Sequence, residues 1–204
     1  MNFTRHEPSG LMTIRSHTFV VLLLAGLAAC AGPDARSGEP VTADTVGAAS
    51  GSAPPDGPLI TGTGVGCVRI GAPVEDVRRE CDVVGDTTLH LEGQPQPALQ
   101  VALEGDTVIA EAVDDRIWRI RIVSPGLSTA DSLHVGTPVR DLADLPDAMV
   151  SWGEGQSFLI APSHCGLSFA IDGLPYRAQP WTAEELASLE DSVRISMILI
   201  TGGC

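Results

Sequence analysis

The cysteine at position 30 is the residue whose setting points most directly to a chemical modification. Cys30 follows two alanines at the end of the apolar run 19–29, and Arg15 precedes the run. A run of eleven residues has the length of a signal-peptide core, whereas a membrane-spanning helix needs about 20 residues. The pattern therefore predicts an exported chain whose Cys30 thiol is placed for covalent attachment of lipid.

The segment Leu27-Ala28-Ala29-Cys30 resembles the lipobox of bacterial lipoproteins. The resemblance implies a diacylglyceryl thioether on Cys30, cleavage before this residue and acylation of the new amine. The lipid would link the protein to a membrane of the cell envelope, and Ala31 in place of an aspartate favours the outer membrane. The alternative is an ordinary secretory signal in which the cysteine has no role. Residues 1–29 are expected to form the signal peptide, and Met12 is an alternative start.

Residues 30–58 are expected to form the lipidated end and a flexible tether. They contain many Gly, Pro, Ala, Ser and Asp residues and no aromatic residue, so they bury too little apolar surface to offset chain entropy. Residues 59–204 are sufficient for one folded domain. The chain has 12 Lys plus Arg against 26 Asp plus Glu, a formal net charge of −14. This charge argues against nucleic acid as a partner.

A ten-residue pattern occurs twice at an offset of 65 residues, because residues 68–77 recur as 133–142 with Gly, Pro, Val and Asp unchanged. Each copy indicates a short strand, a glycine turn and a helix with proline in its first turn. The repeat predicts two tandem units, at about 67–125 and 132–204, each a strand and a helix followed by an antiparallel sheet. The expected fold class is therefore α+β, with both units packed as one domain.

Alternating apolar residues and turn signals predict the strands of both units. The expected strands are 99–103, 107–112, 116–123, 148–152, 156–161, 167–172 and 193–200. In the expected strand 116–123, Trp118 is expected to face the core, whereas Arg119 and Arg121 face water. A capping box that begins at Thr182 predicts a further helix over 183–190.

Each unit opens with the pattern Gly-x-x-x-x-Asp after a short strand. The pattern runs from Gly71 to Asp76 and from Gly136 to Asp141. It resembles the opening of the tandem α-plus-sheet units in β-lactamase-inhibitor proteins and in small outer-membrane assembly lipoproteins. The resemblance covers about ten residues in each unit. It implies a protein-binding module without catalysis.

Four cysteines follow Cys30, and an even number in an exported chain suggests disulfides. They are Cys67, Cys81, Cys165 and Cys204. Three pairings are possible. We favour Cys67 with Cys81 and Cys165 with Cys204, because Cys67 and Cys81 are absent together from the second repeat unit. A metal site is the competing interpretation. No Cys-x-x-Cys spacing is present, so we predict neither a metal nor a cofactor.

No catalytic residue can be assigned from the spacing. His164 lies in the expected turn 162–166, and a Ser/His/Asp triad would have to combine distant residues. The glycine-rich segment 62–66 lacks the helix and lysine that a phosphate site requires. The sequence therefore favours a protein without enzymatic activity, and an enzyme remains open as an alternative.

Tyr176, Arg177 and Trp181 are the candidates for contact with a partner, because they lie on a proline-bounded loop. Aromatic and arginine side chains on such loops are favoured interface anchors. The alternative is that they cover the core from outside. The leading hypothesis is a lipid-anchored, non-catalytic module that binds another envelope protein. An envelope hydrolase with dispersed catalytic residues and a carrier of a small apolar ligand are the alternatives.

Overall fold

The computed structural model describes residues 57–91 and 93–203, which belong to the unit Ser50–Cys204. The predicted signal peptide, Cys30 and nearly all of the tether lie outside the described residues, as does Cys204. In the ranges described, no helix is long and apolar enough to cross a membrane. The expectations about lipid attachment and tethering therefore stay predictions.

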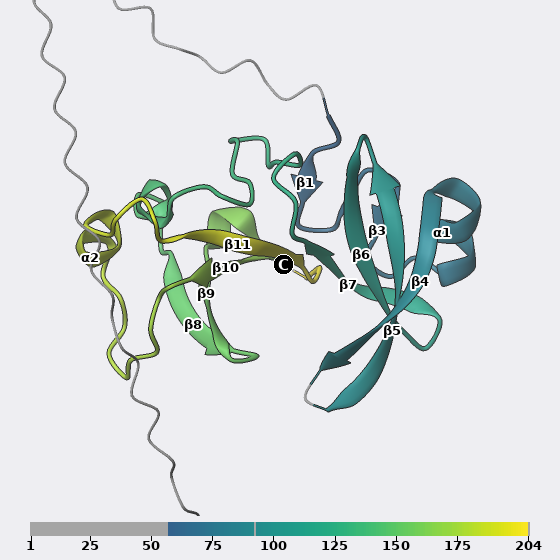
Figure 1. Cartoon of the computed structure of the whole chain (residues 1–204). Coiled ribbons are helices and arrows are strands. Elements are labelled where there is room, and N and C mark those ends of the chain that lie inside the picture. The colour runs from purple at the N-terminus through teal and green to yellow at the C-terminus, as the bar shows by residue number, and fades with distance from the viewer. Residues whose placement is uncertain (1–56, 92, 204) are drawn as a thin grey trace, which may run out of the picture. The chain divides into compact units, whose positions relative to one another are not determined.

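An eight-stranded antiparallel sheet is the largest element of the described structure (Figure 1). Its strands are β4 (Asp82–Leu91), β5 (Gln94–Leu103), β6 (Asp106–Val113), β7 (Arg116–Ile122), β8 (Met149–Gly153), β9 (Gln156–Ile160), β10 (Leu167–Asp172) and β11 (Arg194–Ile200). Their spatial order is β4-β5-β6-β7-β11-β10-β9-β8. Two four-stranded meanders are thus joined through their last strands, β7 and β11, and this pairing leaves β4 and β8 as the edges.

Short elements surround this sheet. A three-stranded sheet contains β1 (Ile60–Thr61), β2 (Gly64–Val65) and β3 (Val68–Arg69), and it precedes helix α1 (Val74–Glu80). Single 3-10 turns cover Val139–Leu142 and Pro162–His164, and helix α2 covers Ala183–Ala187. The predicted capping box is confirmed, because the Thr182 hydroxyl accepts from the Glu185 N–H and the Glu185 carboxylate accepts from the Thr182 N–H.

The predicted α+β class is wrong, because the fold is mostly β. Helix α1 has seven residues, and the helix expected in the second unit is only the 3-10 turn Val139–Leu142. Pro146 explains why no longer helix forms at this turn. The residue before a proline avoids the helical conformation, so the helix has no room to extend. The first meander also begins with the ten-residue strand β4, which the sequence pattern does not predict. Tandem strand-helix-sheet units therefore do not describe this protein.

Both copies of the ten-residue pattern make the same corner. Gly71 and Gly136 have φ angles of 82° and 100°, and a Cβ on either would meet no atom within 4 Å. The backbone conformation, rather than crowding, therefore requires glycine. Their N–H groups donate to carbonyl oxygens of β7 and β11 at 2.6 and 2.8 Å. The guanidinium groups of Arg116 and Arg194 donate to the two glycine carbonyls at 2.8 and 2.7 Å. Each corner is thus held by the last strand of its meander.

The expected alternation in β7 fails at Trp118, which is 38% exposed, whereas Arg119 is only 4% exposed. In the pairing of β6 with β7, Arg119 lies opposite Glu111, and Ile117 lies opposite the next residue of β6, Ala112. Trp118 is therefore the extra residue of a β-bulge. The bulge turns Trp118 from the core face to the face that carries Glu111 and Arg119. Arg119 keeps its expected face and is buried there in ion pairs with Glu111 and Glu154.

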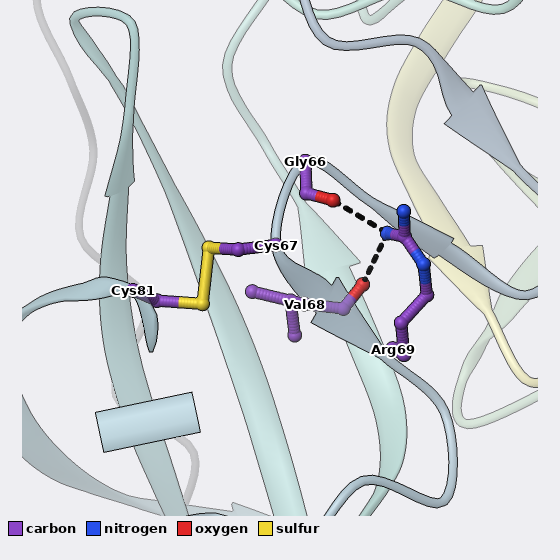
Figure 2. Close-up of a disulfide and its surroundings, with 5 residues drawn as sticks. All are labelled: Gly66, Cys67, Val68, Arg69 and Cys81. Atoms are coloured by element: carbon purple, nitrogen blue, oxygen red, sulfur yellow. Dashed lines mark hydrogen bonds between the residues drawn. A yellow bond between two sulfur atoms is a disulfide. The ribbon is translucent and has the colours of Figure 1, made fainter. Parts of the chain in front are cut away.

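Figure 2 shows the Cys67–Cys81 disulfide, which joins the turn before β3 to the end of α1. The two Cα atoms lie 5.8 Å apart, and the bridge has the pairing favoured from the sequence. The second favoured pairing involves Cys204, outside the described residues. The Sγ atom of Cys165 lies 3.2 Å from the carbonyl oxygen of Gly203, the residue directly before Cys204. The Cys165–Cys204 pairing stays a prediction.

Candidate functional site

A groove beside edge strand β8 brings the predicted contact residues together. Residues 148–152 and Ser157 of the neighbouring strand β9 line this cavity of about 320 Å³, together with residues 175–181 of the loop after β10. Successive side chains of a strand point to opposite faces of its sheet. A cavity lined by consecutive strand residues therefore follows the free edge of β8. Tyr176, Arg177 and Trp181 all belong to the opposite wall.

The hydrogen-bond ladder directs backbone groups of β8 into this groove. Gly153 and Gln156 flank the two-residue turn between β8 and β9, and such flanking residues exchange both hydrogen bonds of the ladder. Bonded and non-bonded pairs then alternate along the hairpin, so the N–H and C=O groups of Val150 and Trp152 point away from β9. Among the described residues, no backbone hydrogen bond beyond the strand pairings involves Val150 or Trp152.

Two exposed aromatic side chains stand beside this edge. Trp152 is 47% exposed and Tyr176 is 65% exposed, and their ring centroids lie 5.4 Å apart in an edge-to-face arrangement. Trp181 is partly buried against the main core. Large apolar groups that are exposed together mark binding surfaces more often than isolated ones do. The groove therefore offers aromatic surface next to unpaired backbone groups.

Arg177 shapes the groove wall through contacts within its own loop. Its guanidinium group forms a two-pronged ion pair with Glu185 of α2 and also donates to the carbonyl oxygens of Pro180 and Gln179. The group lies 3.8 Å from the centroid of the Trp181 ring. The hydrogen bond from Arg177 is the main reason that the pKa of Glu185 falls from 4.5 to about 2. These contacts make Arg177 a structural support of the groove.

A second cavity, of about 600 Å³, joins a serine, a histidine and an aspartate. The Ser163 hydroxyl lies 3.0 Å from Nδ1 of His164, and Nε2 of His164 lies 2.9 Å from Oδ2 of Asp131. The Thr129 hydroxyl donates to Asp131 at 2.6 Å. Burial opposes ionisation of Asp131, but the hydrogen bonds from Thr129 and His164 outweigh it and lower the pKa of the carboxyl. The tautomer that donates Nε2–H to Asp131 leaves Nδ1 as an acceptor for the serine proton.

Sequence reasoning missed Asp131, because 33 positions separate it from His164 and no local pattern relates them. The other two described histidines lie elsewhere: His90 lines a cavity with Arg121, and Nδ1 of His134 lies 2.9 Å from the carbonyl oxygen of Ser132. Within residues 57–91 and 93–203, no three His, Cys, Asp or Glu side chains are grouped as metal ligands would be.

Comparison with known proteins gives a fold but no function. No protein-family model matches the sequence, and no curated protein matches it. Among solved structures, the chain is similar to the uncharacterized protein yfeY from Escherichia coli. The two share 16% sequence identity, and the similarity covers 70% of this chain and 99% of that chain with a TM-score of 0.51. At this identity the similarity shows a shared fold alone.

Proposed function

We propose that the protein is a lipid-anchored, non-catalytic module of the cell envelope that binds an extended segment of another envelope protein beside β8. The observation that carries this proposal is the groove along the free edge of β8. An added strand gains main-chain hydrogen bonds from an exposed edge and specificity from pockets for alternate side chains. Val150 and Trp152 supply the unpaired backbone groups, and Tyr176 supplies aromatic surface on the opposite wall.

The groove favours a particular chemistry in the bound segment. A strand beside β8 would direct every second side chain toward Trp152 and Tyr176, so an apolar residue fits there. Exposed Asp147 lies just before β8, and the chain carries a net charge of −14. Opposite charge increases the rate of encounter and excludes unsuitable partners. We therefore expect an extended apolar segment with a basic residue at the end that lies beside Asp147.

The predicted lipid on Cys30 and the tether support this function. A binding domain that is linked to a membrane meets other proteins of that membrane at a raised effective concentration. A modest affinity for a short extended segment is then sufficient.

The proposal is tested by removing one free-edge donor of β8. Val150→Pro deletes an N–H group that points into the groove and leaves the β8–β9 ladder intact, and proline is tolerated at such edge positions. We expect this variant to fold and to lose capture of the partner by photo-crosslinking from position 149, another exposed position of the groove, in cells. In the purified complex, the amides of Val150 and Trp152 should become protected from hydrogen exchange.

The aromatic wall is tested with a matched control. Trp152→Ala combined with Tyr176→Ala should weaken capture, whereas Trp118→Ala removes an exposed tryptophan from β7 and should leave capture unchanged. The proposal is wrong if Val150→Pro and the double variant capture the partner as well as Trp118→Ala does. Circular dichroism of each variant separates loss of binding from loss of folding.

A hydrolase is the second candidate, and the contact of Ser163, His164 and Asp131 favours it. In a triad, a histidine oriented by an acid takes the proton of a serine that attacks the substrate. If the protein has this activity, the purified chain should hydrolyse p-nitrophenyl acetate, and Ser163→Ala should abolish hydrolysis while Ser188→Ala, at another exposed serine, does not. Equal rates for both variants would exclude this candidate.

A further inference from the structure

A buried cluster of charges lies on the face of the sheet opposite the main core. Glu111 of β6 is fully buried, and the side chains of Arg119 and Arg121 of β7 are 5% and 15% exposed. Arg119 contacts both oxygens of Glu111 through Nε and Nη2 at 2.9 to 3.1 Å, and Nε of Arg121 lies 3.1 Å from Oε1. Glu154 reaches both arginines from the turn between β8 and β9. Two guanidinium groups thus share one fully buried carboxylate and one turn carboxylate.

One guanidinium nitrogen of this cluster lacks a partner. Nη2 of Arg121 is buried and makes no hydrogen bond within the described residues. It lies 3.7 Å from Oε2 of Glu154, which is too far for a hydrogen bond. Nη1 of Arg121 has only the sulfur of Met197 at 3.1 Å, which is a weak acceptor. The outer edge of the Arg121 guanidinium group is therefore poorly satisfied.

This arginine borders a cavity that is separate from the groove. The cavity has a volume of about 450 Å³ and is lined by Arg121, Glu154, Gln156 and His90 together with Leu91 and Gly155. None of these residues lines the groove beside β8. The volume lies within the range of small-molecule sites, roughly 300–1,000 Å³. Besides the arginine, the glutamine amide and the imidazole are able to donate hydrogen bonds to a ligand.

We propose that this cavity binds a small organic carboxylate, which accepts hydrogen bonds from the two Nη atoms of Arg121. A guanidinium group matches a carboxylate in geometry and binds it through two parallel hydrogen bonds. Glu154 competes with this ligand, because its own carboxylate pairs with the same arginines.

The position of Glu154 suits it to that competition. It lies on a two-residue turn at φ 49° and its side chain is 32% exposed, whereas Glu111 lies within β6 and is inaccessible. Glu154 is therefore the partner that can move away. When it does, two arginines face the single carboxylate of Glu111, and the excess positive charge favours an incoming anion.

The test is a titration of the full chain with sodium acetate at constant ionic strength, followed by NMR of the arginine Nε–H groups and of the His90 ring. We expect saturable shifts at Arg121 and His90. Glu154→Gln removes the competing charge and should lower the dissociation constant about tenfold, because a charge a few ångströms away in a partly buried site acts strongly. Arg121→Lys keeps the positive charge but loses the planar donors, and it should abolish the saturable response.

The control is Arg140→Gln, which removes an exposed arginine that pairs with Asp191 outside the cavity. This variant should bind acetate as the wild type does. The proposal is wrong if Glu154→Gln does not tighten binding, or if Arg140→Gln and Arg121→Lys weaken it equally. Equal affinity for inorganic phosphate would overturn the assignment to carboxylates. Because no groove residue is changed, these outcomes do not depend on the function proposed for β8.

Discussion

Replacing Glu111 by glutamine should destabilise the protein more than the same change at Glu154, the other acidic residue of the charge cluster. Glu111 is fully buried, and both Arg119 and Arg121 donate to its oxygens. Glutamine has nearly the same shape, so the change removes the charge without creating a cavity. The arginines remain ionised because the guanidinium group does not lose its proton in proteins. Their positive charges would then lie buried with only the partly exposed Glu154 to balance them.

The expected magnitude follows from this burial. Breaking a buried ion pair by removing one partner costs about 3–5 kcal/mol, a large part of the roughly 5–15 kcal/mol that stabilises a typical domain. At about 2–4 °C for each kcal/mol in a domain of this size, the melting temperature should fall by roughly 6–20 °C. Glu154 is one-third exposed, and Glu154→Gln should cost only about 1 kcal/mol.

Urea unfolding followed by circular dichroism measures both variants. A shift of the midpoint at constant slope reports a change of stability alone. The reasoning is refuted if Glu111→Gln loses no more free energy of unfolding than Glu154→Gln. That result would mean that water or a rearranged side chain already compensates the buried arginines.

Three further predictions concern other parts of the chain. Replacing Cys67 and Cys81 together by serine should lower the free energy of unfolding by about 3 kcal/mol, and an unchanged urea midpoint would show that the bridge is not a stabilising one. Cys30→Ser should move the protein from the detergent phase to the aqueous phase, and identical partitioning of both forms would end the lipoprotein interpretation. Because the pKa of Glu185 is lowered to about 2, the stability from its ionised form is present above pH 4.5 and lost as pH falls toward 2. The melting temperatures of wild type and Glu185→Gln should therefore differ at pH 6 and converge near pH 2, and a constant difference would contradict the role of the Arg177 ion pair.

The strands of the second meander could be predicted from the sequence within one or two residues. Expected strands at 148–152, 156–161, 167–172 and 193–200 correspond to β8 to β11. Their signals are local: alternating apolar residues, turn residues and the capping box at Thr182. The Cys67–Cys81 disulfide could also be predicted, because the two cysteines flank the first copy of the repeated pattern and both are absent from the corresponding positions of the second unit.

The fold class and the setting of β7 could not be predicted in this way. The second copy of the pattern has helical spacing at Val139 and Leu142, yet only a 3-10 turn forms there. The bulge at Trp118 depends on how β7 pairs with β6, and it turns Trp118 to the face of the sheet that carries Arg119. Periodicity within one segment contains no information about such pairing.

By itself the sequence determined where strands β6 to β11 begin and end to within one residue, which loop carries Tyr176 and Trp181, and which two cysteines join near α1, because these properties depend on neighbouring residues. Only the tertiary structure decided that β7 pairs with β11. That pairing makes β8 an edge strand and opens the groove beside it. The tertiary structure also brought Asp131 to His164, and it placed Glu154 from a distant turn against the arginines of β7. Contacts between residues far apart in the chain depend on the packing of the whole sheet, which no local pattern specifies.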